Sequence, residues 1–500
     1  MRDSKFLTKL MIFAVLMVVS TAWAFDFSEI ENKIVEYKLD NGLTIIVLPR
    51  HDAPVVSFVT NVNTGVADDP KGATGLAHMF EHMAFKGTEE IGSKDLKKEM
   101  NWMAEEDRIF ELILDERSKG DLADSAKLAE LEADMALATD SAFAYSETNE
   151  FGKIADRNGG VGLNAGTSFD NTAYYISFPS NKLELWMAME SDRFHKPVLR
   201  ELFKEKQVVA EERRYRVESM PIGRMVNEYL GLAYISHPYG QPLIGEMSEI
   251  QDYNRPVMME QFNKYYIPRN MAIGIVGDVD PEEVYKLAQK YFGRLEDKPK
   301  PRPQWIEEQE SFGIRKSTIV EKSQPMVIFG YHVPSRVHPD WVALNALAGY
   351  LGSGRTSVFY KELVKDKKSA VAVETFTGYP GSKYPSLFSV LCVPSNESSN
   401  SENETAILAE IDKVRTELIP ESELEKIKAQ AKAGMINGLA SNTGMASRLT
   451  RYQLSHGDWR ELFNYLDKVN ALTTDDIKRV AETYLDPEKR FAVYIEKPEE

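Results

Sequence analysis

The sequence predicts an α+β protein made of two similar half-domains, each a mixed β-sheet packed by helices. Three observations lead to this prediction. The chain has 500 residues, more than one domain usually holds. A pattern of helix, proline turn and strand occurs twice, at 256–276 and 474–495. A strand followed by a helix also occurs twice, beginning near Pro54 and near Pro325.

The composition is that of a folded protein with an acidic balance. The net charge is −17, with 43% hydrophobic and 27% charged residues. This charge disfavours nucleic acid as a partner, and it fits either a preference for basic peptides or simple solubility. Cys392 is the only cysteine, which excludes a disulfide within the chain and a zinc site built on several cysteines.

The first 24 residues are typical of a cleaved signal peptide. They begin with three basic residues, Arg2, Lys5 and Lys9, followed by an apolar run at 10–19. A small-x-small cleavage site follows at Ala22, Trp23 and Ala24. A mitochondrial transit peptide, the alternative, would be richer in Arg and would lack Asp3. The remaining chain has no apolar run long enough to cross a bilayer. We therefore expect a periplasmic or secreted protein without a stable membrane anchor.

The first half-domain, 25–295, begins with a β-hairpin and contains an insertion. Residues 35–39 and 43–48 form the hairpin strands around an Asp-Asn-Gly turn at 40–42. The two copies of the helix, proline turn and strand pattern are 218 residues apart, whereas the two copies of the strand and helix pattern are 271 residues apart. The difference means that the first half carries about 53 extra residues between the two patterns. We assign them to a helical hairpin at about 101–156. Its expected inner seam is Ile109, Leu112, Ile113, Leu128, Leu131 and Met135. The insertion is either a surface elaboration or a lid or docking arm.

A proline-rich segment separates the halves. Proline alternates with charged residues at 296–303, a composition that forms neither a helix nor a central strand. We place the linker at 296–310 and the second half-domain at 311–500. Within the second half, the Ser/Asn-rich stretch 396–404 is expected to be a flexible loop.

A His-x-x-Glu-His motif at His78, Glu81 and His82 predicts a metal site. Histidines four residues apart lie on one face of a helix, so both rings can bind one ion. A carboxylate on that side is suited to act as a general base on water. The flanking residues are apolar, which predicts a buried helix that ends at Gly87.

A third zinc ligand is expected from a run of acidic residues much later in the chain. Glu205 and Glu212 are two helical turns apart on one face, so one can bind the metal and the other can lie behind it. Glu211 points away and is expected to face solvent. The alternative is a charged surface helix with ordinary ion pairs, such as Glu211 with Arg214.

Together these motifs resemble the family of pitrilysin, insulin-degrading enzyme and mitochondrial processing peptidase. The matching segments cover most of the chain outside the insertion: 77–88, 158–160, 164–172, 189–193, 205–214 and 237–240. The resemblance implies a zinc endopeptidase with one Zn²⁺ per chain, held by His78, His82 and Glu212, with Glu81 as the catalytic base. It implies that Glu205 is the family's second carboxylate. Glu212 follows His82 by 130 residues; subtracting the 53-residue insertion gives 77, and the family spacing is about 76.

The resemblance also implies how substrate binds. Residues 160–175 resemble the family's active-site edge strand, to which an extended peptide adds as a further strand. Asn164 and Ala165 match substrate-binding positions on that strand. This mode suits peptides and unfolded polypeptides, because folded proteins offer few free strands.

The second half resembles the family's inactive half-domain. Its counterpart of the zinc helix, 343–351, has no histidine or glutamate. The family's assisting Arg and Tyr fall on Val364 and Val371, which cannot donate a hydrogen bond. Short family members usually pair with a second subunit, so we expect a zinc-less paralogue or a homodimer. The alternative is a non-catalytic structural or peptide-binding subunit of the same fold.

Overall fold

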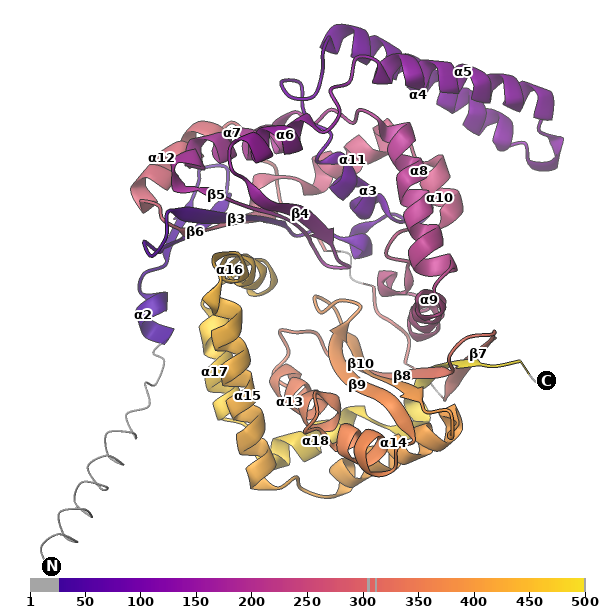
Figure 1. Cartoon of the computed structure of the whole chain (residues 1–500), viewed down its shortest axis with the longest axis vertical. Helices are drawn as coiled ribbons and strands as arrows, with labels where there is room; N and C mark the ends of the chain where they lie inside the picture. The colour runs from indigo at the N-terminus through magenta and orange to yellow at the C-terminus, as the bar shows by residue number, and fades with distance from the viewer. Residues whose placement is uncertain (1–26, 304–305, 311–312, 499–500) are drawn as a thin grey trace, which may run out of the picture.

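Two β-sheets form the two halves of the protein in the computed structural model, which describes residues 27–303, 306–310 and 313–498. The predicted signal peptide lies outside the described residues. Figure 1 shows one sheet in each half of the molecule, with the long helices around them and one helix, α16 (Asn442–His456), between the sheets. The predicted α+β class is confirmed.

The first sheet has six strands in the order β1-β2-β6-β3-β5-β4. Their bounds are β1 (Val35–Lys38), β2 (Thr44–Pro49), β3 (Val55–Val62), β4 (Val161–Thr167), β5 (Thr172–Pro179) and β6 (Met271–Gly277). Only β2 and β6 pair in parallel. The predicted hairpin is β1 and β2, and Gly42 in its turn has φ +84, a conformation that glycine adopts without strain. Strand β4 is an edge strand, so one side of its backbone is available for pairing.

The second sheet repeats this arrangement. Its order is β7-β11-β8-β10-β9, and only β7 and β11 pair in parallel. Its strands are β7 (Arg315–Val320), β8 (Met326–Val333), β9 (Ala370–Tyr379), β10 (Ser386–Pro394) and β11 (Phe491–Glu496). Each corresponds in place and direction to a strand of β2-β6-β3-β5-β4. The predicted repeat of two mixed sheets is therefore confirmed.

Helices cover the sheets. In the first half they are α2 (Phe27–Glu31), α3 (Leu76–Met83), α6 (Glu150–Arg157), α7 (Leu183–His195), α8 (Leu202–Arg213), α9 (Pro221–Ala233), α10 (Met247–Asp252), α11 (Arg255–Tyr265) and α12 (Pro281–Phe292). In the second half they are α13 (Trp341–Gly352), α14 (Asn400–Thr416), α15 (Glu421–Ala440), α16, α17 (Glu461–Asn470) and α18 (Thr474–Tyr484). Helix α16 packs Met445, Ala446 and Leu449 against Val59 and Val276 of the first sheet, which joins the halves through a buried apolar contact.

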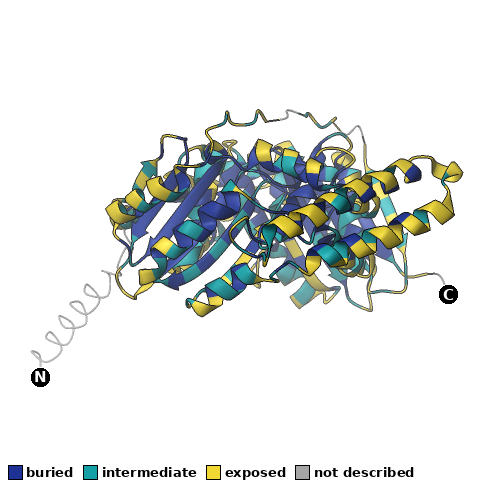
Figure 2. Ribbon diagram, turned by 90° about the horizontal axis from the view of Figure 1, so that it is seen from above, coloured by how far each residue is buried: buried dark blue, intermediate teal, exposed yellow. Residues whose placement is uncertain are grey.

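The insertion is a hairpin of two long helices, α4 (Leu96–Arg117) and α5 (Ser125–Phe143), as predicted. Figure 2 shows it as an arm with much of its surface exposed. The buried seam contains five of the six predicted residues together with Ala138. Leu112 is the exception, because it is 36% exposed and lies outside the seam. The first helix begins five residues before 101, where Asp95 caps it by accepting from the backbone N–H of Lys98.

The flexible loop expected at 396–404 is wrong in its second half. Helix α14 begins at Asn400 with a capping box, in which Ser399 and Glu402 each bind the other's backbone N–H. Asn400 is buried and its side-chain amide donates to the carbonyl of Ile495. The Ser and Asn residues therefore start a helix.

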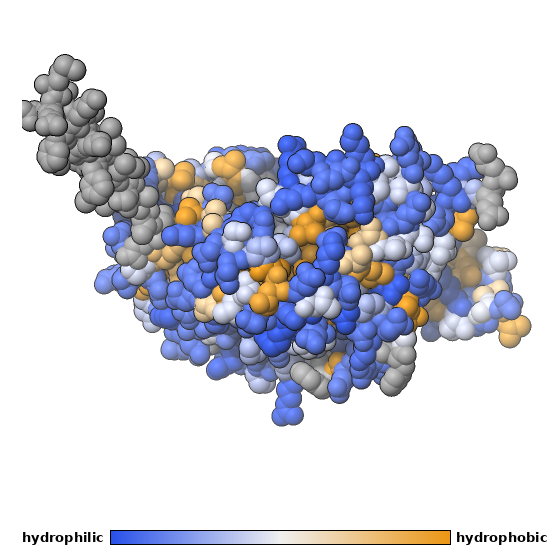
Figure 3. Space-filling model, turned by 90° about the horizontal axis from the view of Figure 1, so that it is seen from below, coloured by the Kyte–Doolittle hydropathy of each residue, from blue (hydrophilic) through white to orange (hydrophobic). Residues whose placement is uncertain are grey.

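One face of the protein is predominantly hydrophilic. Figure 3 shows one face on which apolar side chains form small groups within a mostly polar surface. Among the described residues, no helix is both long and apolar enough to cross a membrane.

Candidate metal centre

Helix α3 carries the His-x-x-Glu-His motif, and a buried carboxylate fixes where the helix begins. The two oxygens of Asp69 accept from the backbone N–H groups of Gly75, at 2.8 Å, and Ala77, at 3.0 Å. Gly75 has φ +84, and a Cβ atom on it would lie 2.2 Å from the carbonyl oxygen of Ile244. This close approach and the positive φ both require glycine. The helix ends at Met83, four residues before the predicted end at Gly87.

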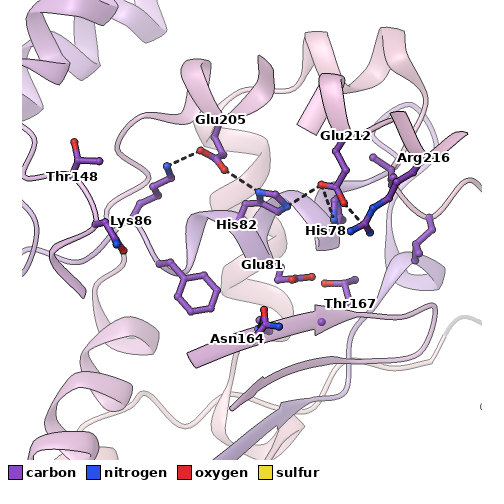
Figure 4. Close-up of a pocket in the computed structure, with 16 residues that line it drawn as sticks. His78, Glu81, His82, Lys86, Thr148, Asn164, Thr167, Glu205, Glu212 and Arg216 are labelled. Atoms are coloured by element: carbon purple, nitrogen blue, oxygen red, sulfur yellow. Dashed lines mark hydrogen bonds and ion pairs between the residues drawn. The ribbon is translucent and has the colours of Figure 1, made fainter. Parts of the chain in front are cut away.

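The two histidines lie on one face of α3, and α8 presents Glu212 to them. The ring centroids of His78 and His82 are 4.8 Å apart. Oε2 of Glu212 lies 3.7 Å from Nε2 of His78 and 3.4 Å from Nε2 of His82. One potential ligand atom from each residue lies within 4.8 Å of the others. Figure 4 shows the three side chains converging from the two helices. The structure thus brings together the three residues that the sequence proposes as ligands.

Glu205 lies outside this triad and binds the far side of one ring. Its Oε1 is 2.9 Å from Nδ1 of His82, and its Oε2 is 2.6 Å from Nζ of Lys86. Burial by itself raises the pKa of Glu205, but the hydrogen bonds from His82 and Lys86 outweigh it and lower that pKa. Glu205 therefore stands as a carboxylate that orients His82, the role suggested for one of the two glutamates. Glu211 is 70% exposed and pairs with Arg214, so it faces solvent as expected.

The two histidines differ in their electrostatic environment. Burial and then the neighbouring His82 lower the pKa of His78. Burial also lowers the pKa of His82, but hydrogen bonds with Glu205 and Glu212 outweigh it and raise that pKa to about 9. The hydrogen bonds with the two glutamates therefore make His82 the more basic of the two rings.

Glu81 faces the same cavity from α3. This cavity has a volume of about 670 Å³ and is lined by His78, Glu81, His82 and Glu212 on one side and by β4 on the other. Figure 4 shows Glu81 between the histidines and the strand. Asn164 and Ala165, the predicted substrate-binding residues, both line the cavity. In the register of the sheet they pair with Tyr175 and Tyr174 of β5, which leaves the other side of β4 toward the cavity.

Arg216 is a site residue that the sequence reasoning missed. Its Nη1 lies 2.9 Å from Oε1 of Glu212, the oxygen that does not face the histidines. It belongs to a π-helical turn, η4 (Arg214–Glu218), which extends α8. Its position four residues after Glu212 was the available signal, because residues at that spacing meet on a helix.

The donor set fits a zinc ion. Two imidazole nitrogens and one carboxylate oxygen form the set typical of a catalytic zinc site, and the adjoining cavity leaves room for water and substrate. The carboxylate behind His82 is the partner that zinc-binding histidines usually have.

Val364 and Val371, which occupy the positions of the family's assisting Arg and Tyr, lie away from this centre. Val364 is part of a π-helical turn, η7 (Tyr360–Asp366), and packs against the hydrophobic core of the second half. Val371 is 65% exposed on the edge strand β9. Within the described chain, neither lines the cavity of the metal centre.

Comparisons with known proteins agree with this fold. The family description "Insulinase (Peptidase family M16)" matches residues 45–107 and 135–246, and "Peptidase M16 inactive domain" matches 252–431. The chain therefore belongs to peptidase family M16, in the short two-domain form. The gap at 108–134 falls within the helical hairpin.

Relatives that match most of this chain include named zinc proteases and subunits of a processing peptidase. The zinc protease PqqE of Helicobacter pylori is 28% identical over 465 residues, which is 91% of each chain. The beta subunit of the mitochondrial-processing peptidase of Saccharomyces cerevisiae is 23% identical, over 88% of this chain and 86% of its own. The crystal structure of a protease from Helicobacter pylori superimposes with a TM-score of 0.77 at 28% identity, covering 93% of this chain and 99% of that one.

Proposed function

We propose that this protein is a zinc-dependent endopeptidase acting on peptides or unfolded polypeptides. One observation carries the proposal: ligand atoms of His78, His82 and Glu212 meet on the wall of a cavity that also contains Glu81 and a free strand edge. When bound, zinc would act as a Lewis acid that polarises a peptide carbonyl and makes water more acidic.

The other groups have separable roles. Glu81 would take a proton from the attacking water and pass it to the leaving amine, the usual task of a carboxylate at such a site. Glu205 holds the ring of His82. Strand β4 would pair with the substrate backbone, so binding would tolerate many sequences while positioning the scissile bond.

The proposal is tested with the purified chain and a quenched unstructured peptide. We expect zinc-dependent cleavage that falls at least 100-fold in Glu81→Gln, because the amide cannot accept the proton. Glu211→Gln is the matched control, since that glutamate faces solvent on α8. Cleavage that persists in Glu81→Gln would refute this role of Glu81.

A second candidate, a peptide-binding or structural subunit without turnover, rests on Val364 and Val371. A zinc-loaded chain that binds the peptide without cleaving it, alone and with added paralogous subunits, would favour this candidate. Cleavage only after a second subunit is added would support a two-chain enzyme, in which the partner is a zinc-less paralogue or a second copy.

We also propose that the protein is exported to the periplasm or secreted. The support is the sequence of residues 1–24 alone. Mass spectrometry of the protein isolated from its own cells would test it. A mature N-terminus near Phe25 is expected, and a chain that retains residues 1–24 would contradict export with cleavage.

A further inference from the structure

Three partly exposed arginines gather on and beside α16, the helix between the two sheets. Arg448 and Arg451 lie one turn apart on α16, and Arg336 lies in the loop between β8 and α13. We call these three residues the arginine cluster. Together with Tyr452 they line a cavity of about 720 Å³. Figure 1 shows α16 between the two sheets, so two of the three arginines lie on the helix that joins the halves.

The cluster has no acidic partner of its own. In the part of the chain that the structure describes, none of the three guanidinium groups makes an ion pair or a side-chain hydrogen bond. By contrast, two arginines that are buried, Arg200 and Arg490, pair with Glu99 and Glu404. Like charges held together without a counter-charge repel one another, and this repulsion is relieved when an anion binds.

Tyr452 and Asp170 both raise the pKa of Arg451, and the carboxylate of Asp170 is already engaged. Asp170 accepts hydrogen bonds from the hydroxyl of Tyr239 and from the backbone N–H groups of Ser382 and Lys383. Burial, followed by Arg336 and Arg448, lowers the pKa of Arg451 despite Asp170. The site therefore keeps an excess of positive charge in a protein whose net charge is −17.

The cluster continues the path of the proposed substrate strand. Thr167, the last residue of β4, lines the cavity of the metal centre. The next residue, Ser168, lines a smaller cavity of about 200 Å³ together with Arg336 and Arg451. A polypeptide paired along β4 advances about 3.3 Å per residue, and its path beyond Thr167 leads toward this smaller cavity.

We propose that the arginine cluster is a carboxylate-binding subsite for polypeptide substrates. It would bind acidic side chains or a free chain terminus through charge-assisted hydrogen bonds, for which the planar guanidinium is well suited. This proposal rests on the proposed function, because it places the substrate along β4. It gives the enzyme a preference for acidic peptides, opposite to the preference that its net charge suggests.

Binding to the zinc-loaded Glu81→Gln chain tests the subsite without cleavage. One unstructured peptide is prepared in three forms: acidic side chains with an amidated end, neutral side chains with a free carboxylate end, and neutral side chains with an amidated end. We expect at least one carboxylate form to bind about tenfold more tightly than the fully neutral form. The carboxylate form that binds more tightly identifies whether the cluster prefers acidic side chains or a free chain end. This difference in affinity should decrease at high salt.

Charge-removing variants locate the effect. Arg448→Gln/Arg451→Gln should abolish the preference, and so should Arg336→Gln, which lies on a different element and so controls for damage to α16. Arg108→Gln/Arg157→Gln removes two charges from exposed positions, 58% and 70% exposed, and should leave the preference intact. Equal binding of the three peptides, a preference that survives in the cluster variants, or competition by inorganic phosphate without carboxylate selectivity would each overturn the proposal.

Cleavage of the same peptides by the unaltered chain is measured separately. Cleavage without a carboxylate preference contradicts the proposed carboxylate subsite but supports the proposed peptidase activity. Selective binding without cleavage, also with added subunits, supports the subsite and overturns the peptidase.

Discussion

His82 lies between two carboxylates: its Nδ1 is 2.9 Å from Oε1 of Glu205, and its Nε2 is 3.4 Å from Oε2 of Glu212. Because both glutamates come from α8, a single helix fixes the orientation of the ring and supplies the proposed third ligand. Lys86 binds the other oxygen of Glu205, so that carboxylate is itself held in place.

Glu205→Gln is expected to weaken zinc binding by about 10- to 100-fold, the usual effect of losing the partner behind a histidine ligand. The amide still fits the space, but it removes the negative charge that supports His82 and leaves Lys86 paired with Glu201 alone. The zinc dissociation constant would be measured by competition with a chelator. Glu211→Gln should bind zinc normally, and an unchanged constant in Glu205→Gln would show that the contact is not needed for metal binding.

Zinc should stabilise the folded chain. A ligand that binds only the native state adds about 2.7 kcal/mol at 100 times its dissociation constant. Thermal unfolding with zinc and with a chelator should therefore differ for the unaltered protein. Glu212→Ala should lose most of this difference, because the triad then has only two donors. A melting temperature that zinc does not change would argue against a metal at this site.

Gly75→Ala should destabilise the protein more than Gly72→Ala does. Both glycines have positive φ, +84 and +88, so each substitution incurs a backbone strain of about 1 kcal/mol. A Cβ on residue 75 would also collide with the carbonyl oxygen of Ile244, whereas residue 72 has open space. We expect an additional loss of about 1–3 kcal/mol in Gly75→Ala, measured by urea unfolding, together with weaker zinc binding. Equal losses would mean that the start of α3 adapts without cost.

The sequence predicts local parts of the site better than distant ones. The spacing of His78 and His82 on a helix follows from four residues, and the structure places them together. Glu212 required the repeat offsets, because it is 130 residues from His82. Asp69 and the arginine cluster left no local pattern, since only the folded chain brings a capping carboxylate or a loop arginine to its partners.

Two fold errors have physical reasons. Leu112 has an apolar side chain between two seam positions, but a helix can point only one stripe at its partner, and Ile109 and Ile113 occupy it. The Ser and Asn content of 396–404 favours a loop. Its Ser-x-x-Glu spacing at Ser399 and Glu402 is a helix-start signal that outweighs composition.

Acid should weaken the contact between the two halves through two histidines. His237 belongs to the first half and His332 to β8, and both rings pack against Tyr234. Burial lowers the pKa of each histidine to about 4. The negative charge of Glu308 raises both pKa values in part, and Asp170 does the same for His237. The positive charge of Arg315 lowers the pKa of His332 further. The unfolded chain, with an ordinary histidine pKa near 6.5, therefore binds more protons than the folded chain between about pH 4 and 6.5.

Stability should accordingly fall as the pH decreases through this window. At pH 5 we expect a loss of about 1–2 kcal/mol per histidine relative to pH 7.5, measured by urea unfolding at the two values. Replacing either His237 or His332 by Gln should reduce the pH dependence, whatever it does to stability at pH 7.5, because glutamine does not titrate. His51→Gln, at an exposed position beside Asp278, is the control and should keep most of the dependence. If the histidine variants lose stability with acid as steeply as the unaltered protein, the dependence arises from carboxylates elsewhere and the two buried rings do not govern the joint between the halves.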